Sequence, residues 1–186
     1  VVSVRLPAGF GLICCGEAVV VYKWRMVGGV VHAGSVNAAD WRVRAGGYGG
    51  GPIDTFPYIL GRDFSGVVSA VGEGADLAVG DEVFGVLDVG QEGAYAEKVG
   101  VKSSILVRKP VGLSHVDAAA IALTGLTAKI SIEDTIKLQP GETILVQGGA
   151  GGVASMGLRT ANQSGASLNT TKRGHTPTER QPGRPP

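Results

Sequence analysis

The sequence predicts a fold of mixed class (α+β/α/β mixed). An all-β unit comes first, and the beginning of an α/β unit follows it. Three observations predict it: short β-rich segments punctuated by glycine up to residue 107, an Ala-rich helical stretch after residue 114, and a strand–glycine–helix pattern near residue 148. Short strands at this spacing favour a small barrel or sandwich, whereas a strand, a glycine turn and a helix open a βαβ unit. A chain of 186 residues can form one domain and part of another.

Five β-rich runs are the predicted strands of the first unit: 27–31, 66–71, 79–86, 94–101 and 105–107. Each contains β-branched residues and is bounded by turn residues. The pattern then changes from strands to a helix. Ser114 and Asp117 have the spacing of a capping box at the start of that helix. Gly125 is expected to interrupt this helix, with a second helical stretch over 127–136.

The segment from residue 148 to 154 carries the most informative motif. An apolar run over 143–147 follows a Gln-Pro-Gly-Glu turn, and Gly149 to Ala154 spells G-x-G-x-x-A. The first glycine permits a tight turn, the second lets the backbone approach a pyrophosphate, and the small last residue lets the helix pack on the strand. Phosphate would lie on the N–H groups of a helix that begins near Gly152. The alternative is a plain glycine turn, since 31 residues are Gly.

The α/β unit ends soon after it starts. Residues 166–171 offer one poor second strand, and the polar, proline-bearing stretch 172–186 is predicted to be a disordered tail. A doubly wound sheet needs several parallel strands covered on both faces, so two strands alone would expose apolar surface and free edges. We expect either that a partner covers them, such as another copy in a homo-oligomer, or that the chain is a truncated product.

Composition and charge exclude several classes of protein. The net charge is +1, and the last fifteen residues alone carry four cations against one Glu. The rest of the chain therefore lacks the excess of basic residues that is typical of nucleic-acid-binding proteins. No apolar run reaches the roughly 18–20 residues of a membrane span. Cys14 and Cys15 are adjacent and have no distant partners, which favours a reducing compartment. We expect a cytoplasmic protein, with an organelle as the alternative, and a small-molecule ligand.

Four local sequences resemble the medium-chain dehydrogenase/reductase superfamily and, within it, the zinc-independent quinone oxidoreductases that include zeta-crystallin. They are VNAADWRVRAG at 36–46, LGRDFSGVV at 60–68, ALTGLTA at 122–128 and QGGAGGVA at 147–154. The resemblance implies a GroES-like β-barrel followed by the beginning of a Rossmann-type nucleotide-binding domain, with the active site in the cleft between them. The expected boundaries are a GroES-like catalytic domain over 1–118 with 1–26 atypical, linking helices and a partial Rossmann domain over 119–171, and the tail.

The resemblance also predicts a protein without zinc. Zinc-dependent alcohol dehydrogenases of the superfamily have a cysteine where this chain has Asn37 and a histidine where it has Arg62, and zinc prefers thiolate and imidazole. Residues 118–123, near which a further ligand is expected, contain no Cys, His or carboxylate. The histidines lack a companion ligand at a useful spacing, and each is expected to be exposed or hydrogen-bonded: His32, His115 and His175.

Two pairs of charged residues are assigned to architecture. Asp40 and Arg44 are spaced to pair at i,i+4 if their segment is helical. Arg62 and the adjacent Asp63 occupy the region of the former zinc site, where a buried charge requires a partner. We expect those two residues to pair with each other or with near neighbours.

The chemistry that fits a site without metal is hydride transfer from a nicotinamide to an electron-poor acceptor. A quinone or an activated alkene or carbonyl needs little Lewis-acid help, so the protein supplies proximity and hydrogen-bond donors. The resemblance places Asn37 and Tyr48 as catalytic residues near the nicotinamide and the acceptor, and Thr127 at the nicotinamide end of the cofactor. The structural alternatives are that Asn37 closes a turn, Tyr48 packs at the barrel rim and Thr127 caps the second helix.

NADPH is the predicted cofactor. An acid about twenty residues beyond the first motif glycine binds the ribose diol of NAD and repels a 2′-phosphate, but this position falls near Asn169 and Thr170, and the basic Lys172 and Arg173 follow. The predicted cofactor-binding residues are Thr127, Gly149, Ala150, Gly151, Gly152, Val153 and Lys172.

The sequence leaves three functions to compare. The first is NADPH-dependent reduction of a quinone or an activated alkene or carbonyl, which the family resemblance favours. The second is a catalytically incompetent truncated fragment that acts as a binding or interaction module, which the chain length favours. The third, a zinc-dependent alcohol dehydrogenase, is disfavoured by Asn37 and Arg62.

Overall fold

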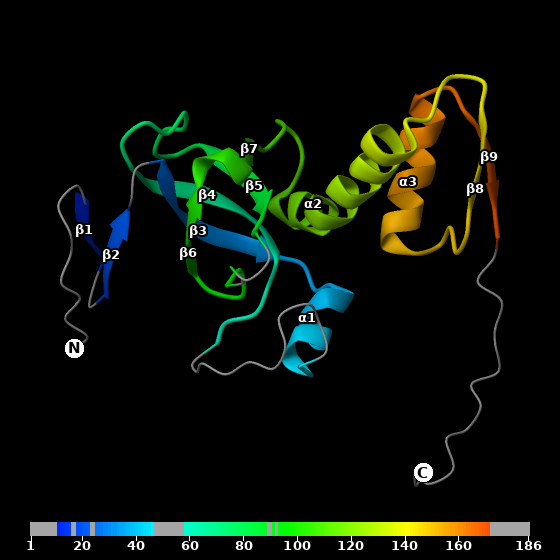
Figure 1. The fold of residues 1–186 in the computed structure, drawn as a ribbon. Coiled ribbons are helices and arrows are strands. Elements are labelled where there is room, and N and C mark those ends of the chain that lie inside the picture. The colour runs from blue at the N-terminus through cyan, green and yellow to red at the C-terminus, as the bar shows by residue number, and fades with distance from the viewer. Residues whose placement is uncertain are drawn as a thin grey trace, which may run out of the picture. The chain divides into compact units, whose positions relative to one another are not determined.

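The computed structural model describes residues 11–15, 18–22, 25–46, 58–88, 91 and 93–171. It divides into two compact units, Val1–Leu123 and Thr124–Pro186. Figure 1 labels the helices and strands of both units, which are described separately. None of the helices in the described part of the chain is both long and apolar enough to cross a membrane.

The first unit is built on a five-stranded antiparallel sheet with the order β6-β3-β4-β5-β7. Its strands are β3 (Met26–Gly34), β4 (Asp63–Val71), β5 (Glu82–Val86), β6 (Lys98–Lys102) and β7 (Leu106–Arg108), with a 3-10 turn η1 (Ser103–Ile105) before the last. All five predicted strands are present, although residues 79–81 and 94–97, which were predicted as strand, come before the start of β5 and β6. A separate antiparallel hairpin precedes the sheet and consists of β1 (Gly11–Cys15) and β2 (Ala18–Tyr22).

Close packing of β4 on β3 depends on Gly66. A Cβ atom added at Gly66 would lie 2.0 Å from the main-chain oxygen of Val30, so only glycine fits this approach. The sheet then buries apolar side chains in two clusters: Phe64, Leu87, Ala94, Val99 and Val101 in one, and Val27, Val68 and Val83 in the other.

The helix α2 (His115–Lys129) begins where the capping box predicted it. The Asp117 N–H donates to Ser114 Oγ at 3.0 Å, and that hydroxyl donates to Asp117 Oδ2 at 2.6 Å. The predicted interruption at Gly125 is wrong, because α2 passes through it and gives way only after Lys129 to the π-helix η2 (Ile130–Ile136). A glycine inside a helix costs only about 1 kcal/mol relative to alanine, and the neighbouring Leu and Ala are good helix formers.

The second unit contains the predicted strand, glycine turn, helix and second strand. The strands β8 (Thr143–Val146) and β9 (Ser167–Thr170) are parallel, and α3 (Gly152–Gln163) connects them; Figure 1 shows α3 beside this pair. The predicted exposure of apolar surface is also observed, since every residue of β9 is exposed and Leu145 of β8 is 59% exposed.

Candidate functional site

The turn between β8 and α3 offers free backbone donors. Gly148 adopts a left-handed conformation, with φ of 71°, and its carbonyl accepts the Gly151 N–H at 2.9 Å. Gly151 is the N-cap of α3, and the first helical hydrogen bond runs from the Ser155 N–H to the Gly151 carbonyl at 2.8 Å. The N–H groups of residues 152–154 therefore have no acceptor within the helix. With the positive end of the helix dipole, they form a site suited to an anion.

The glycines of this turn are required first by packing within the protein. A Cβ at Gly149 would lie 2.1 Å from Thr170 Oγ1, and one at Gly152 would lie 3.2 Å from Thr124 Cγ2. Thr170 Oγ1 donates to the Val146 carbonyl at 2.9 Å. Gly149 thus makes room for the threonine at the end of β9, whose hydroxyl bonds the last residue of β8.

The other predicted cofactor residues have different surroundings. Ala150 and Val153 are exposed at the turn and the start of α3, whereas Lys172, like the catalytic candidate Tyr48, lies outside the described residues. Thr127 lies inside α2, so the alternative that it caps a second helix is wrong. Sequence reasoning missed Thr124, which faces Gly152; its only signal was its place in the same LTGLT segment.

Asn37 lies at the N-cap of the short helix α1 (Ala38–Arg44), where it joins a network centred on Asp63. Its Nδ2 atom donates to Ser35 Oγ at 3.1 Å and to Asp63 Oδ1 at 3.0 Å. The Ser35 hydroxyl donates to Asp63 Oδ2 at 2.8 Å, and the Leu123 N–H approaches the same oxygen at 3.3 Å. The fully buried Asp63 carboxylate therefore accepts three hydrogen bonds, one from each of three residues.

The second carboxylate of this site is Asp40, which is 2% exposed. Its Oδ2 accepts the Asn37 N–H at 2.6 Å and the Tyr95 hydroxyl at 2.8 Å, while no partner within the described part of the chain reaches Oδ1. The expected pairing with Arg44 is absent: the described residues show no ion pair at Asp40. As the third residue of α1, Asp40 instead reaches back to the N-cap.

Burial raises the pKa of the Asp63 carboxyl above its ordinary value. The hydrogen bonds from Ser35, the Leu123 N–H and Asn37 oppose this rise, and the nearby Asp40 adds to it. Burial and the hydrogen bond to Asp40 also raise the pKa of the Tyr95 hydroxyl. Tyr95 is therefore a neutral donor at ordinary pH.

Arg62 and Asp63 each bond nearby groups and not each other, which is the second of the two arrangements expected. The buried Arg62 donates from Nε and Nη2 to the Leu87 carbonyl at 3.2 and 3.1 Å. Arg62 lies in the bend just before β4, and its side chain bonds the Leu87 carbonyl whereas that of Asp63 bonds Ser35 and Asn37, so the two charges have different partners. Within the described ranges, no group of three or more His, Cys, Asp or Glu side chains is arranged to hold a metal ion.

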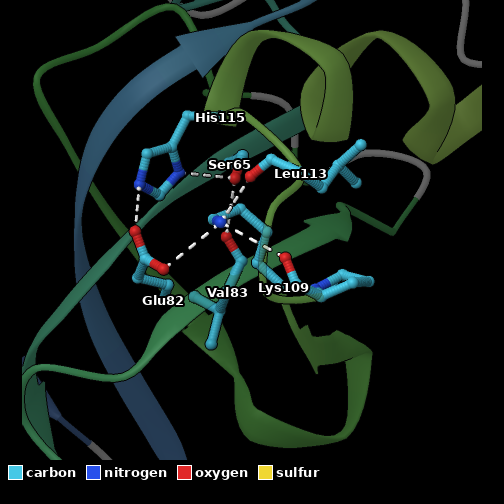
Figure 2. Close-up of polar contacts among 7 residues, drawn as sticks. Ser65, Glu82, Val83, Lys109, Leu113 and His115 are labelled. Carbon is cyan, nitrogen blue, oxygen red and sulfur yellow. Dashed lines mark hydrogen bonds and ion pairs between the residues drawn. The ribbon is translucent and has the colours of Figure 1, made fainter.

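Figure 2 shows a second polar cluster that fastens the start of α2 to the sheet. His115 Nδ1 lies 2.8 Å from Ser65 Oγ, and its Nε2 lies 3.1 Å from Glu82 Oε1. Lys109 Nζ lies 3.2 Å from Glu82 Oε2, and this contact lowers the pKa of Glu82. Ser65 is fully buried and its hydroxyl bonds the Val83 carbonyl at 2.9 Å, so the cluster is architectural.

The surroundings of His115 confirm the prediction that this histidine is exposed or hydrogen-bonded. His115 is satisfied by hydrogen bonds, and its ring stacks on His32 at 4.6 Å between centroids. The stacking was not predicted, because the two residues are far apart in the sequence.

This chain is similar in sequence to a known domain family and to parts of several longer curated proteins. The family model described as alcohol dehydrogenase GroES-like domain matches residues 30–111. A quinone oxidoreductase-like protein 2 homolog of Nematostella vectensis is 38% identical over 141 residues, which are 74% of this chain and 37% of the relative. A mycocerosic acid synthase-like polyketide synthase of Mycobacterium tuberculosis is 35% identical over 142 residues, 76% of this chain and 6% of the relative.

Solved structures share the fold. An alcohol dehydrogenase superfamily protein from Novosphingobium aromaticivorans has a TM-score of 0.75 at 34% identity, covering 83% of this chain and 50% of that one. The Escherichia coli quinone oxidoreductase complexed with NADPH has a TM-score of 0.70 at 27% identity, with 88% and 51% coverage. CurK enoyl reductase has a TM-score of 0.66 at 28% identity, with 79% and 46% coverage.

The chain thus spans about half the length of these solved structures and a smaller share of the curated relatives. The family model, the relatives and the shared fold agree with the resemblance carried by the four sequence motifs, and they confirm the predicted fold class. Residues 30–111 thus form a GroES-like domain of the alcohol dehydrogenase type, and the chain is similar in sequence and fold to quinone oxidoreductases and alcohol dehydrogenases of the medium-chain dehydrogenase/reductase superfamily.

Proposed function

We propose that this protein acts in the NADPH-dependent reduction of a quinone or an activated alkene or carbonyl, by hydride transfer without a metal. The observation that carries the proposal is the β8–α3 turn, where the N–H groups of residues 152–154 are free of helical acceptors beside the end of a parallel strand. A dinucleotide pyrophosphate fits this arrangement. Solved structures similar to this chain include a quinone oxidoreductase complexed with NADPH and an enoyl reductase, and a quinone and an enoyl group are both electron-poor.

The turn and the end of β9 would hold the cofactor. Gly151, Gly152 and Val153 would offer backbone N–H groups to the pyrophosphate, with Gly149 and Ala150 shaping the turn. The end of β9 carries Asn169 and Thr170, Thr171 follows, and none of the three is a carboxylate. Neutral donors accommodate a ribose 2′-phosphate that an acid would repel, so NADPH is favoured over NADH. We further propose that Thr127 and Lys172 contact the nicotinamide end and the 2′-phosphate.

Bound NADPH supplies the hydride, and the protein positions the reactants. Asn37 and Tyr48 are proposed to line the reduction site, with the Tyr48 hydroxyl donating to an acceptor oxygen as negative charge develops. The order of the Asn37 side chain supports its role, since its amide nitrogen has two partners and its main-chain N–H a third. Such fixed geometry suits the close positioning that hydride transfer requires.

Titration of the purified chain with NADPH, followed by tryptophan and cofactor fluorescence with NADH as the control, tests this function. We expect saturable binding that favours NADPH, together with quinone-dependent NADPH oxidation. The substitution Ala150→Asp places a negative charge in the exposed turn, where it repels phosphate without disturbing the core; it should weaken binding at least about tenfold.

A matched variant controls for charge alone. Asn162→Asp adds the same charge at an exposed position near the opposite end of α3 and should leave NADPH affinity within about threefold of the wild type. Absence of NADPH binding by a chain that is folded by circular dichroism would reject the function, and equal losses in both variants would reject the turn as the phosphate site.

A further inference from the structure

A pocket of about 420 Å³ opens on the first unit. It is lined by Arg25, by the turn that follows β4, by η1 and by the two ends of β7. Its volume lies within the roughly 300–1,000 Å³ that is typical of small-molecule sites. The lining shares no residue with the network around Asp63 or with the β8–α3 turn, so the proposed function does not use this pocket.

Two leucines supply the apolar part of the lining. Leu77 and Leu106 both pack against the buried cluster of Val27, Val68 and Val83, so the core of the sheet holds this wall in place. A ligand that covers the two leucines removes apolar surface from water. The pocket therefore favours a ligand with an apolar body.

Arg108 brings a fixed cation to the pocket. Its Nη2 atom lies 2.9 Å from Asp81 Oδ2 and donates to the Asp76 carbonyl at 3.2 Å. A guanidinium has five N–H donors on three nitrogens, so these two bonds orient the group without using Nε or Nη1. The lining also includes Ser103 and Ser104, whose hydroxyl groups can donate to an oxyanion.

Arg25 reaches the pocket from a backbone conformation that arginine rarely adopts. Its φ is 59°, in the left-handed region that glycine and asparagine adopt more readily. The main chain is held there from both sides, because the Arg25 N–H donates to the Glu73 carbonyl and the Arg25 carbonyl accepts the Ser103 N–H, each at 2.8 Å. Backbone strain that the surroundings enforce in this way is found most often at functional sites.

We propose that this pocket binds a small phosphate monoester with an apolar body. Guanidinium groups bind phosphate oxygens through paired N–H···O bonds, and two arginines with two serine hydroxyls offer more donors than the two oxygens of a carboxylate can use. The exposed Asp76 carboxylate also lines the pocket and opposes an anion. Two arginines against one aspartate still leave the lining with a charge of +1.

Phenyl phosphate is the probe that tests the site without a cofactor. Its binding to the isotope-labelled chain is followed by NMR through the backbone amide signals of Gly74 and Ser104. We expect saturable shifts with a Kd on the order of 1 mM. Benzoate, with fewer oxygens, and inorganic phosphate, without the apolar body, should each bind at least about fivefold more weakly. No saturable shift up to about 20 mM, or equal affinity for either comparison anion, overturns the proposal.

Three variants test which charges bind the probe. Arg25→Asn removes a cation but suits the left-handed backbone, so it should fold and weaken phenyl phosphate binding at least about fivefold. Asp76→Asn removes the opposing carboxylate and should strengthen binding about twofold. Arg44→Gln removes an exposed cation of α1 as the matched control, and it should stay within about twofold of the wild type. Equal losses in Arg25→Asn and Arg44→Gln, or weaker binding by Asp76→Asn, overturn the proposal.

The substitution Ala150→Asp separates this pocket from the β8–α3 turn. It disturbs the proposed phosphate site of the turn, but the affinity for phenyl phosphate measured at Ser104 should stay within about twofold of the wild type. A larger loss at Ser104 would assign these shifts to binding at the turn and would overturn the proposal. Failure of the wild type to bind NADPH rejects the proposed function and leaves the pocket to be decided by phenyl phosphate.

Discussion

The five-stranded sheet of the first unit and the parallel strand pair of the second unit differ in how far they bury their apolar side chains. In the first, Phe64, Val27 and Val83 have no exposed surface, whereas in the second, Leu145 is 59% and Leu168 36% exposed. Antiparallel strands form a stable sheet with one face in water, but parallel strands are normally covered on both faces. The first unit therefore contains its own core, and the second unit leaves apolar side chains of its strand pair exposed.

Core truncation should show the largest difference between the two units. Phe64→Ala removes a fully buried aromatic ring from the main cluster and should lower the free energy of unfolding of the first unit by about 3–5 kcal/mol. Leu145→Ala removes a side chain that is mostly in water and should cost less than about 1 kcal/mol. Both tryptophans of the chain lie before residue 123, so urea unfolding followed by their fluorescence reports on the first unit, and hydrogen exchange reports on β8. Similar losses in the two units would contradict this comparison.

Glycine substitutions should have opposite signs in the two units. Gly66→Ala places a Cβ 2.0 Å from the Val30 carbonyl oxygen and must push β3 and β4 apart, at a cost of about 1–3 kcal/mol. Gly157→Ala in α3 meets no atom within 4 Å and should stabilise the second unit by roughly 0.5–1 kcal/mol through helix propensity. Thermal unfolding of Gly66→Ala and hydrogen exchange in α3 of Gly157→Ala measure the two effects. A neutral Gly66→Ala would show that the strands have room to separate.

The free energy of unfolding of the first unit should depend on pH through the titration of Asp63. Its pKa in the folded state is raised above the ordinary 3.8, so the folded chain binds this proton more tightly than the unfolded chain. The contribution of Asp63 to the free energy of unfolding should therefore fall as pH rises from 3.8 through the folded pKa. The measurement is the difference in free energy of unfolding between the wild type and Asp63→Asn, obtained by urea unfolding at a series of pH values. Asp76→Asn is the control. A difference that grows with pH would mean that the hydrogen bonds to Asp63 outweigh its burial.

Local features of both units were predictable from the sequence, and contacts between distant segments were not. The glycine turn, the strands and the cap at Ser114 depend on neighbouring residues, so their patterns are visible in a short window. The continuity of α2 through Gly125 was missed because local propensity treats glycine as a break, although the helix tolerates it. The partners of Asp63 were missed because they lie 26, 28 and 60 residues away. Adjacency suggested Arg62 as one possible partner, but the Arg62 side chain bonds the Leu87 carbonyl instead.

The smallest effects should separate buried from exposed polar contacts. Ser65→Ala removes a buried hydroxyl that bonds the Val83 carbonyl and contacts His115 Nδ1, which leaves polar groups of the first unit without a partner and should cost about 1–2 kcal/mol. The pair of Lys129 and Glu133 in the second unit is exposed, and Glu133→Gln should cost no more than about 0.5 kcal/mol. Unfolding at low and high salt distinguishes them, because only the exposed pair is screened by ions. A salt-sensitive loss in Ser65→Ala would show instead that the charged groups around His115, and not its hydrogen bonds to the sheet, hold the start of α2.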